Sequence, residues 1–335
     1  MNGTQMKAIV LTKYGSFDVL QLKEVEKPTP GGNEALVKIH ATSLNAADME
    51  IMRGDFMPRL LYKGLFKPKY TILGTDLAGT IESVGKNVKE FKPGDEIWGD
   101  LSFPYKHGAF AEYVCIPEKA LRLKPASMTF EEAAATPTSA VVALQHLRCK
   151  RPLEKGHKVL LNGAGGSVGT FAIQIAKHFG AEVTAVDSTK KLDMLSEIGA
   201  DHVIDYTKED FTKNGKHYDL IVDVVVQRWA FAYKRALSPN GIAVLVGGSM
   251  KKVFLNVLLG LFIKVTTGKK IGLGMWKPNK KEDLDFLQEL FETGKVKPVI
   301  DKTYPLSKIP EAMKRLEKGG VMGKAVVRVV DEKKS

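Results

Sequence analysis

The segment at residues 158–179 constrains the fold of this chain more than any other stretch. A short apolar strand, KVLLN at Lys158–Asn162, leads into the run GAGGSVG at Gly163–Gly169, and a helix is predicted at Val168–Phe179. The first, fourth and last positions of the run are glycines, which would supply a tight turn, close backbone approach to a pyrophosphate and a helix–strand contact. The helix N-terminus presents free N–H groups to phosphates. We therefore predict a dinucleotide-binding loop that comprises Gly163, Gly165, Gly166, Ser167, Val168 and Gly169.

Strands and helices alternate after this loop. Strands rich in Val, Ile and Leu are predicted at 182–186, 202–204, 219–225 and 241–247, with helical crossovers between them. Such strands form a parallel sheet that helices cover on both faces. The run departs from strict GxGxxG spacing, because Val168 stands where a count from Gly163 requires glycine. Its place between a strand and a helix still predicts an α/β Rossmann domain.

The end of the second strand should select between the two nicotinamide dinucleotides. Asp187 lies where an acid accepts hydrogen bonds from the adenosine ribose and repels a 2′-phosphate, which favours NAD(H). Ser188, Lys190 and Lys191 follow it and could instead bind a 2′-phosphate. Asp187 could also simply cap the next helix. NADP(H) and NAD(H) therefore both remain open as cofactors.

The regions on either side of this α/β segment have a different pattern. Before Pro125, short β-rich segments separated by Pro and Gly predict antiparallel strands. After about Lys277, isolated helices and strands end with GKAVVRVV at Gly323–Val330, which we interpret as a return to the first domain. The predicted architecture is α/β, with a Rossmann cofactor domain at 126–276 inserted in a β-rich catalytic domain of residues 1–125 and 277–335.

Charge and cysteine content limit the functional classes. The 50 Lys and Arg outnumber the 38 Asp and Glu, for a formal charge of +12. The lysines are interpreted as scattered solvated residues, and no nucleic-acid motif accompanies them, so we expect no nucleic-acid partner. Cys115 and Cys149 are too few for a disulfide framework or a four-thiolate zinc site.

One long apolar run, VFLNVLLGLFIKV at Val253–Val265, falls short of the ~20 residues that a membrane span needs. It is interpreted as a buried or interface helix, and no membrane partner is expected. A partner subunit covering Phe254–Ile263 would make the protein a homodimer. No secretory signal is visible, so a cytoplasmic location is expected.

Several ordered motifs accompany the glycine run. They include SLNAAD at Ser43–Asp48, LGTDLAGTI at Leu73–Ile81, GAFAEY at Gly108–Tyr113 and GADHVIDY at Gly199–Tyr206. Together these motifs resemble the medium-chain dehydrogenase/reductase superfamily, and most closely its zinc-free quinone oxidoreductases. The resemblance covers nearly the whole chain, from Met6 to Val327, and implies a GroES-like fold for the β-rich domain.

The resemblance also implies a chemistry. Zinc-dependent members carry Cys near Leu44 and Asn45 and Gly-His-Glu where this chain has Gly74, Thr75 and Asp76, so no metal is expected. A small electrophilic substrate, a quinone or an α,β-unsaturated carbonyl compound, would accept hydride from NAD(P)H. The alternative is a nicotinamide-binding protein with little turnover. Val226, where the family often has Gly, favours that alternative, because its side chain would lie near the cofactor.

Individual roles follow from the same resemblance. Asn45 is a predicted catalytic and cofactor-binding residue whose amide would donate near the nicotinamide or the substrate oxygen, although it could simply cap a turn. Thr138 is expected near the nicotinamide ring, although it could simply start a helix. Tyr62 is the predicted proton donor, with Tyr105 and His107 as other candidates. Further cofactor contacts are predicted at Val246, Gly247, Gly248, Asn279 and Lys324.

Overall fold

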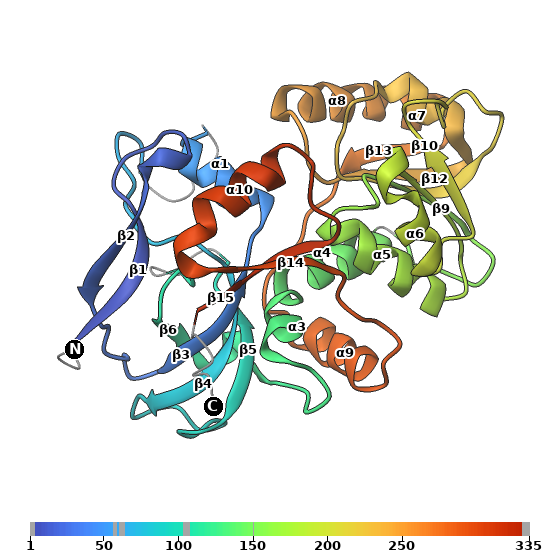
Figure 1. Cartoon of the computed structure of the whole chain (residues 1–335). Helices are drawn as coiled ribbons and strands as arrows, with labels where there is room; N and C mark the ends of the chain where they lie inside the picture. Colours follow the sequence, from blue (N-terminus) through green and yellow to red (C-terminus); the bar gives the residue numbers. More distant parts are fainter. Residues whose placement is uncertain (1–3, 56–58, 60–63, 103–107, 150, 330–335) are drawn as a thin grey trace. The chain divides into compact units, whose positions relative to one another are not determined.

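A computed structural model describes the chain except residues 1–3, 56–58, 60–63, 103–107, 150 and 330–335. The chain divides into two compact units. Unit 1 comprises residues 1–138, 278–292 and 298–335, and unit 2 comprises residues 139–277 and 293–297. Figure 1 shows both, coloured along the sequence.

Unit 2 contains a six-stranded parallel sheet in the order β10-β9-β8-β11-β12-β13. The order runs outward in both directions from β8, which is the arrangement of a Rossmann domain and confirms that prediction. The strands are β8 (Lys158–Asn162), β9 (Glu182–Asp187), β10 (His202–Asp205), β11 (Tyr218–Asp223), β12 (Leu237–Leu245) and β13 (Lys270–Leu273).

Helices connect these strands because the intervening segments alternate apolar and polar faces. They are α5 (Ser167–His178), the 3₁₀ turn η3 (Thr189–Lys191), α6 (Leu192–Glu197), α7 (Ala230–Ala236) and α8 (Met250–Thr267). A buried core that includes Leu160, Ile221 and Ala243 lies between sheet and helices. Among the described residues, no helix is both long and apolar enough to cross a membrane.

Unit 1 contains a seven-stranded sheet in the order β14-β15-β3-β4-β5-β7, with β6 also paired to β3, and a separate β1–β2 hairpin. All pairs are antiparallel except β14 with β15. The strands are β1 (Gln5–Leu11), β2 (Leu20–Glu26), β3 (Glu34–Ser43), β4 (Asp76–Val84), β5 (Glu96–Asp100), β6 (Tyr113–Pro117), β7 (Leu121–Leu123), β14 (Ile300–Pro305) and β15 (Lys324–Arg328).

The helical elements of unit 1 flank this sheet. They are η1 (Phe17–Val19), α1 (Ala46–Arg53), η2 (Glu118–Ala120), α3 (Phe130–Ala134), α9 (Lys281–Glu292), η4 (Leu306–Lys308) and α10 (Ile309–Glu317), and α4 (Pro137–Leu147) starts at the unit boundary. A capping box between Thr129 and Glu132 starts α3, which packs on β3 and β4. Residues 126–138 thus lie in unit 1, whereas the sequence assigned them to the Rossmann domain; the domain boundaries stay a prediction.

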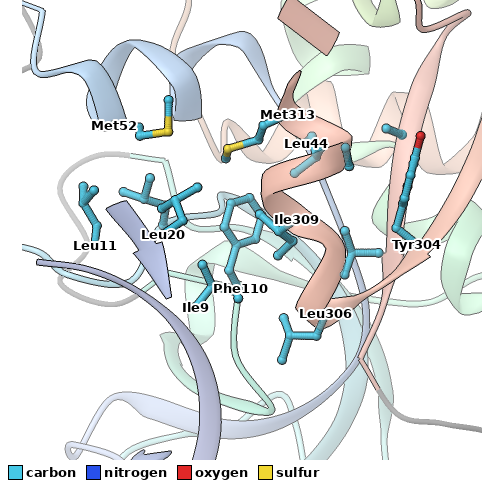
Figure 2. Packing of buried hydrophobic residues seen from close by; sticks show 14 of the residues in the cluster. Ile9, Leu11, Leu20, Leu44, Met52, Phe110, Tyr304, Leu306, Ile309 and Met313 are labelled. Carbon is cyan, nitrogen blue, oxygen red and sulfur yellow. The ribbon is translucent and has the colours of Figure 1, made fainter. Parts of the chain in front are cut away.

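The C-terminal segment completes the core of unit 1. Figure 2 shows Ile309 and Met313 of α10 among Ile9, Leu44 and Phe110 from the N-terminal part of the chain. Beside this core β15 pairs with β3, and β3 pairs with β4. These pairings bring the start of β15 next to the end of β3 and the start of β4, where the polar cluster described below is built.

Candidate functional site

A buried ion pair lies at the centre of the polar cluster in unit 1. The Nζ of Lys324, at the start of β15, is 2.9 Å from the Oδ2 of Asp76, at the start of β4, and both side chains are fully buried. The strand register explains the meeting, because Ser43 of β3 pairs with Asp76 on one side and with Val326 on the other. A buried charge is costly unless it is paired and hydrogen-bonded, so each partner requires the other.

Asp76 accepts hydrogen bonds from several further donors. The Ser43 hydroxyl donates to Oδ2 at 2.9 Å. The Thr138 hydroxyl and backbone N–H donate to Oδ1 at 2.6 and 2.9 Å. Burial alone would raise the pKa of Asp76, but the Lys324 ammonium and these hydrogen bonds outweigh it and hold that pKa below its ordinary value. Asp76 is therefore a carboxylate at neutral pH.

The partners of Asn45 fix the orientation of its side-chain amide. Its Oδ1 accepts from the Lys324 ammonium at 2.9 Å, and an ammonium can only donate. Its Nδ2 donates to Asp76 Oδ2 and to Thr75 Oγ1, each at 2.9 Å. Both amide hydrogens are thus used within the cluster, so Asn45 positions Thr75 and Asp76. The predicted donation to a cofactor or substrate would require one of these bonds to break.

Two other carboxyl groups near the cluster have a pKa that is raised toward neutral pH. Asp48 accepts from the backbone N–H groups of Asn45 at 2.8 Å and Gly74 at 3.2 Å, which starts α1. Burial raises the pKa of Asp48 to about 7. Burial, followed by the charge of Asp76, likewise raises the pKa of Asp100 to about 7. The cluster thus concentrates its negative charge on Asp76.

Lys324 has a different environment from the one expected of a cofactor contact. Its ammonium donates to Leu44 O at 3.3 Å as well as to Asn45 and Asp76 at 2.9 Å. Three acceptors match the three hydrogens of an ammonium. Lys324 therefore acts as the fixed cation of the cluster.

Asn279, another predicted cofactor contact, donates its side-chain amide to the carbonyl of Asp100 at 3.0 Å.

The glycine loop of unit 2 joins β8 to α5. The N–H groups of Gly163 and Ala164 donate to the Val186 carbonyl at 3.0 and 3.1 Å, and that of Gly165 donates to Asp187 Oδ2 at 2.8 Å. A Cβ on Gly169 would lie 2.4 Å from the Ala164 carbonyl oxygen, so helix and loop approach too closely for any side chain there.

The start of α5 is open, in contrast to the crowded position of Gly169. A Cβ on Gly166 would meet nothing closer than 3.5 Å. Gly166 caps α5, so the N–H groups of Ser167, Val168 and Gly169 lie in the first turn, where helix geometry provides no intrahelical acceptor. This arrangement suits a phosphate.

Asp187 is directed at the glycine loop. Its Oδ2 accepts from Gly165, its Oδ1 accepts from the Ser188 N–H at 2.8 Å, and the Lys191 ammonium lies 3.9 Å from Oδ1. Lys190 is exposed in η3. The carboxylate and Lys191 are thus paired with each other, while Lys190 extends into solvent.

The ends of β11 and β12 lie side by side in the same sheet. The Val246 N–H donates to the Asp223 carbonyl at 2.8 Å, and Gly247 and Gly248 follow directly. Val226 has a φ of 47°, a left-handed conformation that is strained for a β-branched residue. Its side chain is only 1% exposed and packs in the core of unit 2 with Val253.

Some residues with predicted roles lie outside the described part of the chain, and some residues of the polar cluster had no predicted role. The candidate proton donors Tyr62, Tyr105 and His107 lie outside the described residues. Asp76 and Thr75 were compared with zinc ligands but given no role. A lone lysine in an apolar strand, GKAVV, was the one signal that a buried acid must accompany it. In the described part of the chain, no group of three or more His, Cys, Asp or Glu side chains is placed to hold a metal ion.

Three family descriptions match parts of the chain, and the last two overlap. They are "Alcohol dehydrogenase GroES-like domain" at residues 31–126, "Alanine dehydrogenase/PNT, C-terminal domain" at 140–227 and "Zinc-binding dehydrogenase" at 198–327. The first two correspond to the β-rich and the Rossmann-type parts, as the sequence predicted.

Individual relatives match almost the entire chain. A 2-methylene-furan-3-one reductase of Solanum lycopersicum is 37% identical over 98% of this chain and 80% of its own length. An NADPH-dependent alkenal/one oxidoreductase of Arabidopsis thaliana is 34% identical over 96% of this chain and 79% of its own length. The solved structure of a quinone oxidoreductase from Coxiella burnetii is 29% identical, with a TM-score of 0.87 over 97% of this chain and 100% of that one.

Proposed function

Because this chain belongs to the medium-chain dehydrogenase/reductase superfamily, in its quinone oxidoreductase-like branch, we propose that it is an NAD(P)H-dependent reductase of quinones or α,β-unsaturated carbonyl compounds. The observation that carries the proposal is the glycine loop of unit 2, which leaves free space beside Gly166 and packs tightly against the chain at Gly169. The relatives named as enone, alkenal and quinone reductases supply the substrate class.

The loop fits a nicotinamide dinucleotide. The first-turn N–H groups of Ser167, Val168 and Gly169 would hold the pyrophosphate, and Val246, Gly247 and Gly248 would border the bound cofactor. A bound dihydronicotinamide supplies the hydride. The contribution of the chain is to bind and orient the two reactants, which lowers the entropic part of the barrier.

The polar cluster supports reduction without zinc. Both oxygens of Asp76 already accept from Ser43, Asn45, Thr138 and Lys324, so this carboxylate has no lone pair left for a metal in this arrangement. The Lys324 ammonium supplies positive charge next to Asp76, where a metal cation would be repelled. A carbon that is already electron-poor, as in an enone or a quinone, does not require a metal to accept hydride.

Thr75 is the side chain of the cluster best suited to donate to a substrate oxygen. Its Oγ1 accepts from Asn45, and the Thr138 oxygen 3.3 Å away has its own hydrogen committed to Asp76. The Thr75 hydrogen can therefore turn from this long contact to an oxygen that gains negative charge. Thr75→Val should lower kcat by about tenfold or more with little change in KM, whereas Thr75→Ser should retain most of the activity.

NADPH is the proposed cofactor of the two. The negative charge of Asp187 is offset by Lys191, 3.9 Å away, which weakens its repulsion of a 2′-phosphate. Exposed Lys190 is available to bind that phosphate. Lys190→Ala should raise the KM for NADPH several-fold and leave that for NADH unchanged.

A nicotinamide-binding protein with little turnover is the competing function. The side chain of Val226, which favoured it, is buried in the core of unit 2 instead of projecting toward a ligand, so the support for this alternative is weaker than the sequence suggested. An assay of cofactor oxidation separates the two functions, because both predict cofactor binding and only the reductase predicts turnover.

The test is cofactor oxidation by the purified protein, with NADH and NADPH in parallel and a simple enone and an ortho-quinone as acceptors. Protein-dependent loss of nicotinamide absorbance that survives treatment with a zinc chelator is the expected result. Cofactor binding without turnover would favour the competing function. Turnover that stops on chelation and returns with zinc would contradict the zinc-free part of the proposal.

Homodimer formation is a further part of the proposal, and we place the contact at the edge strand β13 instead of at Phe254–Ile263, where the sequence suggested it. Within the described part of the chain, the edge strand β13 has one row of backbone groups that pairs with no other strand. Leu273 at its end and Met275 shortly after it are 37% and 74% exposed. Pairing of two β13 edges would cover these groups. Light scattering should give twice the mass of one chain, and Leu273→Lys with Met275→Lys should reduce it to that of a monomer.

A further inference from the structure

The outward face of α8 is apolar where a surface helix is normally polar. Its exposed side chains include Phe254 at 63%, Leu258 at 48%, Leu261 at 60%, Phe262 at 62% and Val265 at 88%. These positions follow the spacing of one helical stripe, four, seven, eight and eleven residues after the first. Together with Leu255, 36% exposed, they define the α8 face.

The opposite side of α8 is fixed to unit 2. Val253 and Ile263 are buried in the core, and the Asn256 side chain donates to the Arg228 carbonyl at 3.0 Å. A Cβ on Gly260 would lie 2.4 Å from the carbonyl oxygen of Ile271 in β13, so the helix lies directly against the sheet. The helix is therefore a firm part of unit 2, and its exposed face belongs to the folded state.

Two further exposed aromatic side chains lie on the neighbouring helix. Trp229 and Phe231, at the start of α7, are 50% and 51% exposed. Helix α7 packs against α8, as Figure 1 shows at the outer layer of unit 2. Aromatic side chains with a polar edge, as in Trp, favour the boundary between water and an apolar phase.

The positive charge of the chain is concentrated around this face. Residues 224–277 contain nine Lys and Arg and no Asp or Glu, out of a formal charge of +12 for the whole chain. The basic residues of this segment are about as frequent as in the rest of the chain, so the excess of positive charge comes from the absence of acids. Lys251 and Lys264 of α8 itself are exposed, and the segment offers no carboxylate that could pair with them.

We propose that the α8 face binds the surface of an anionic lipid bilayer, with its apolar side chains in the headgroup region and the surrounding lysines on lipid phosphates. An apolar stripe with a basic surround and no acid is typical of helices that lie in the plane of a membrane. A second copy of the chain fits less well on the α8 face, because a two-fold contact through this helix would bring Lys251 and Lys264 toward the same lysines of the other copy, and α8 has no carboxylate to pair with them. Peripheral binding departs from the expectation of no membrane partner, which followed from the length of the apolar run, and agrees with the expected cytoplasmic location, since cytoplasmic leaflets are anionic.

Sedimentation with lipid vesicles tests this proposal on the full chain. Wild-type protein should sediment with vesicles of phosphatidylcholine and phosphatidylglycerol, should remain in solution with pure phosphatidylcholine, and should be released by high salt. Phe254→Ser with Phe262→Ser should weaken binding at least tenfold, and so should Lys251→Glu with Lys264→Glu. Leu22→Ser with Leu123→Ser is the matched control, because these unit 1 side chains are similarly exposed, at 45% and 52%, and it should bind as wild type.

Other outcomes would overturn the proposal. Absence of wild-type binding to the anionic vesicles would do so, and so would equal binding by the phenylalanine variant and its control. A loss of mass in solution for the phenylalanine variant would instead assign the face to a second copy of the chain. The reductase assay is read separately on each variant, so loss of membrane binding is distinguished from failure of the proposed activity.

Discussion

The glycine loop of unit 2 and the polar cluster of unit 1 are built in opposite ways. The loop is one continuous segment, Gly163–Gly169, which presents backbone N–H groups and an absence of side chains. The cluster draws on separate segments, represented by Asn45, Asp76, Thr138 and Lys324, and consists of side chains that bond to one another. The first arrangement can be recognised from local sequence, whereas the second depends on strand register.

This difference predicts how the two regions respond to substitution. Removal of one charge from the cluster leaves another buried charge without its partner, so stability should be lost. In the loop, Gly169 faces other protein atoms and Gly166 faces open space. Substitution of Gly169 should therefore lower stability, whereas substitution of Gly166 should lower ligand binding alone.

Lys324→Met should produce the largest loss. Without the ammonium, the buried carboxylate of Asp76 loses its countercharge, which costs on the order of 3–5 kcal/mol of unfolding free energy. Urea denaturation measures the loss. In the double variant Lys324→Met, Asp76→Asn, no charge is left unpaired, so part of the stability should return. Strict additivity of the two single effects would show that the pair is not coupled.

Gly169→Ala and Gly166→Ala form a matched pair in the loop. The first places a methyl group against the Ala164 carbonyl at 2.4 Å and should cost about 1–3 kcal/mol of unfolding free energy. The second meets nothing within 3.5 Å and should unfold like wild type. Its methyl group would occupy the space of the pyrophosphate, so NADPH affinity in a fluorescence titration should fall about tenfold or more. Unchanged affinity would exclude this loop as the phosphate site.

The pH dependence of stability should reveal the buried acid Asp100. Its pKa is about 7 in the folded chain and about 3.9 when unfolded, so the folded state binds more protons between these values. The stabilising contribution is complete below the unfolded pKa and is lost as pH rises through the folded pKa. Asp100→Asn removes this loss, so the variant should gain on wild type by on the order of 2–3 kcal/mol between pH 5 and pH 8.

Urea denaturation of the two proteins at each pH gives that difference. Burial lowers the pKa of His40 and of His146, which changes stability in the opposite direction, but both proteins contain these groups and the effect cancels. A difference that stays constant from pH 5 to pH 8 would show that Asp100 is ionised throughout.

Substitution of Val226 should give the smallest effect on stability. We expect it as a reversal of the usual order of stability between an Ala and a Gly variant. At ordinary buried sites Gly is less stable than Ala, by about 0.5–1 kcal/mol in regular elements. At φ 47° a Cβ itself is unfavourable, by about 1–2 kcal/mol, so Val226→Gly should be more stable than Val226→Ala. Val222 of β11, also buried, is the control site, where the ordinary order is expected in thermal unfolding.

Much of the fold could be predicted from local patterns. The apolar run KVLLN coincides with β8, and the helix predicted at Val168–Phe179 coincides with α5 to within one residue at each end. The edge strand β13, with the sequence KIGL, is too short to show one and was missed. The glycine loop was located from its residues alone, because its function depends on the backbone.

The polar cluster could be predicted only in part. Asn45, Thr138 and Lys324 were predicted as site residues, but their common partner Asp76 had no predicted role, because their contacts depend on the pairing of β15, β3 and β4. The role of Lys324 also differs from the prediction: its burial and three acceptors follow from the tertiary fold alone. The charge asymmetry around α8 was present in the sequence and became meaningful once the exposed face of the helix was known.

The most direct test of the proposed reduction is to follow the hydride itself. NADPH that carries deuterium at the transferred position of C4 is incubated with the protein and an enone, and the product is analysed by mass spectrometry and NMR. We expect a saturated ketone with one deuterium on the former β carbon. An unlabelled product, or an allylic alcohol with deuterium on the carbinol carbon, would contradict it.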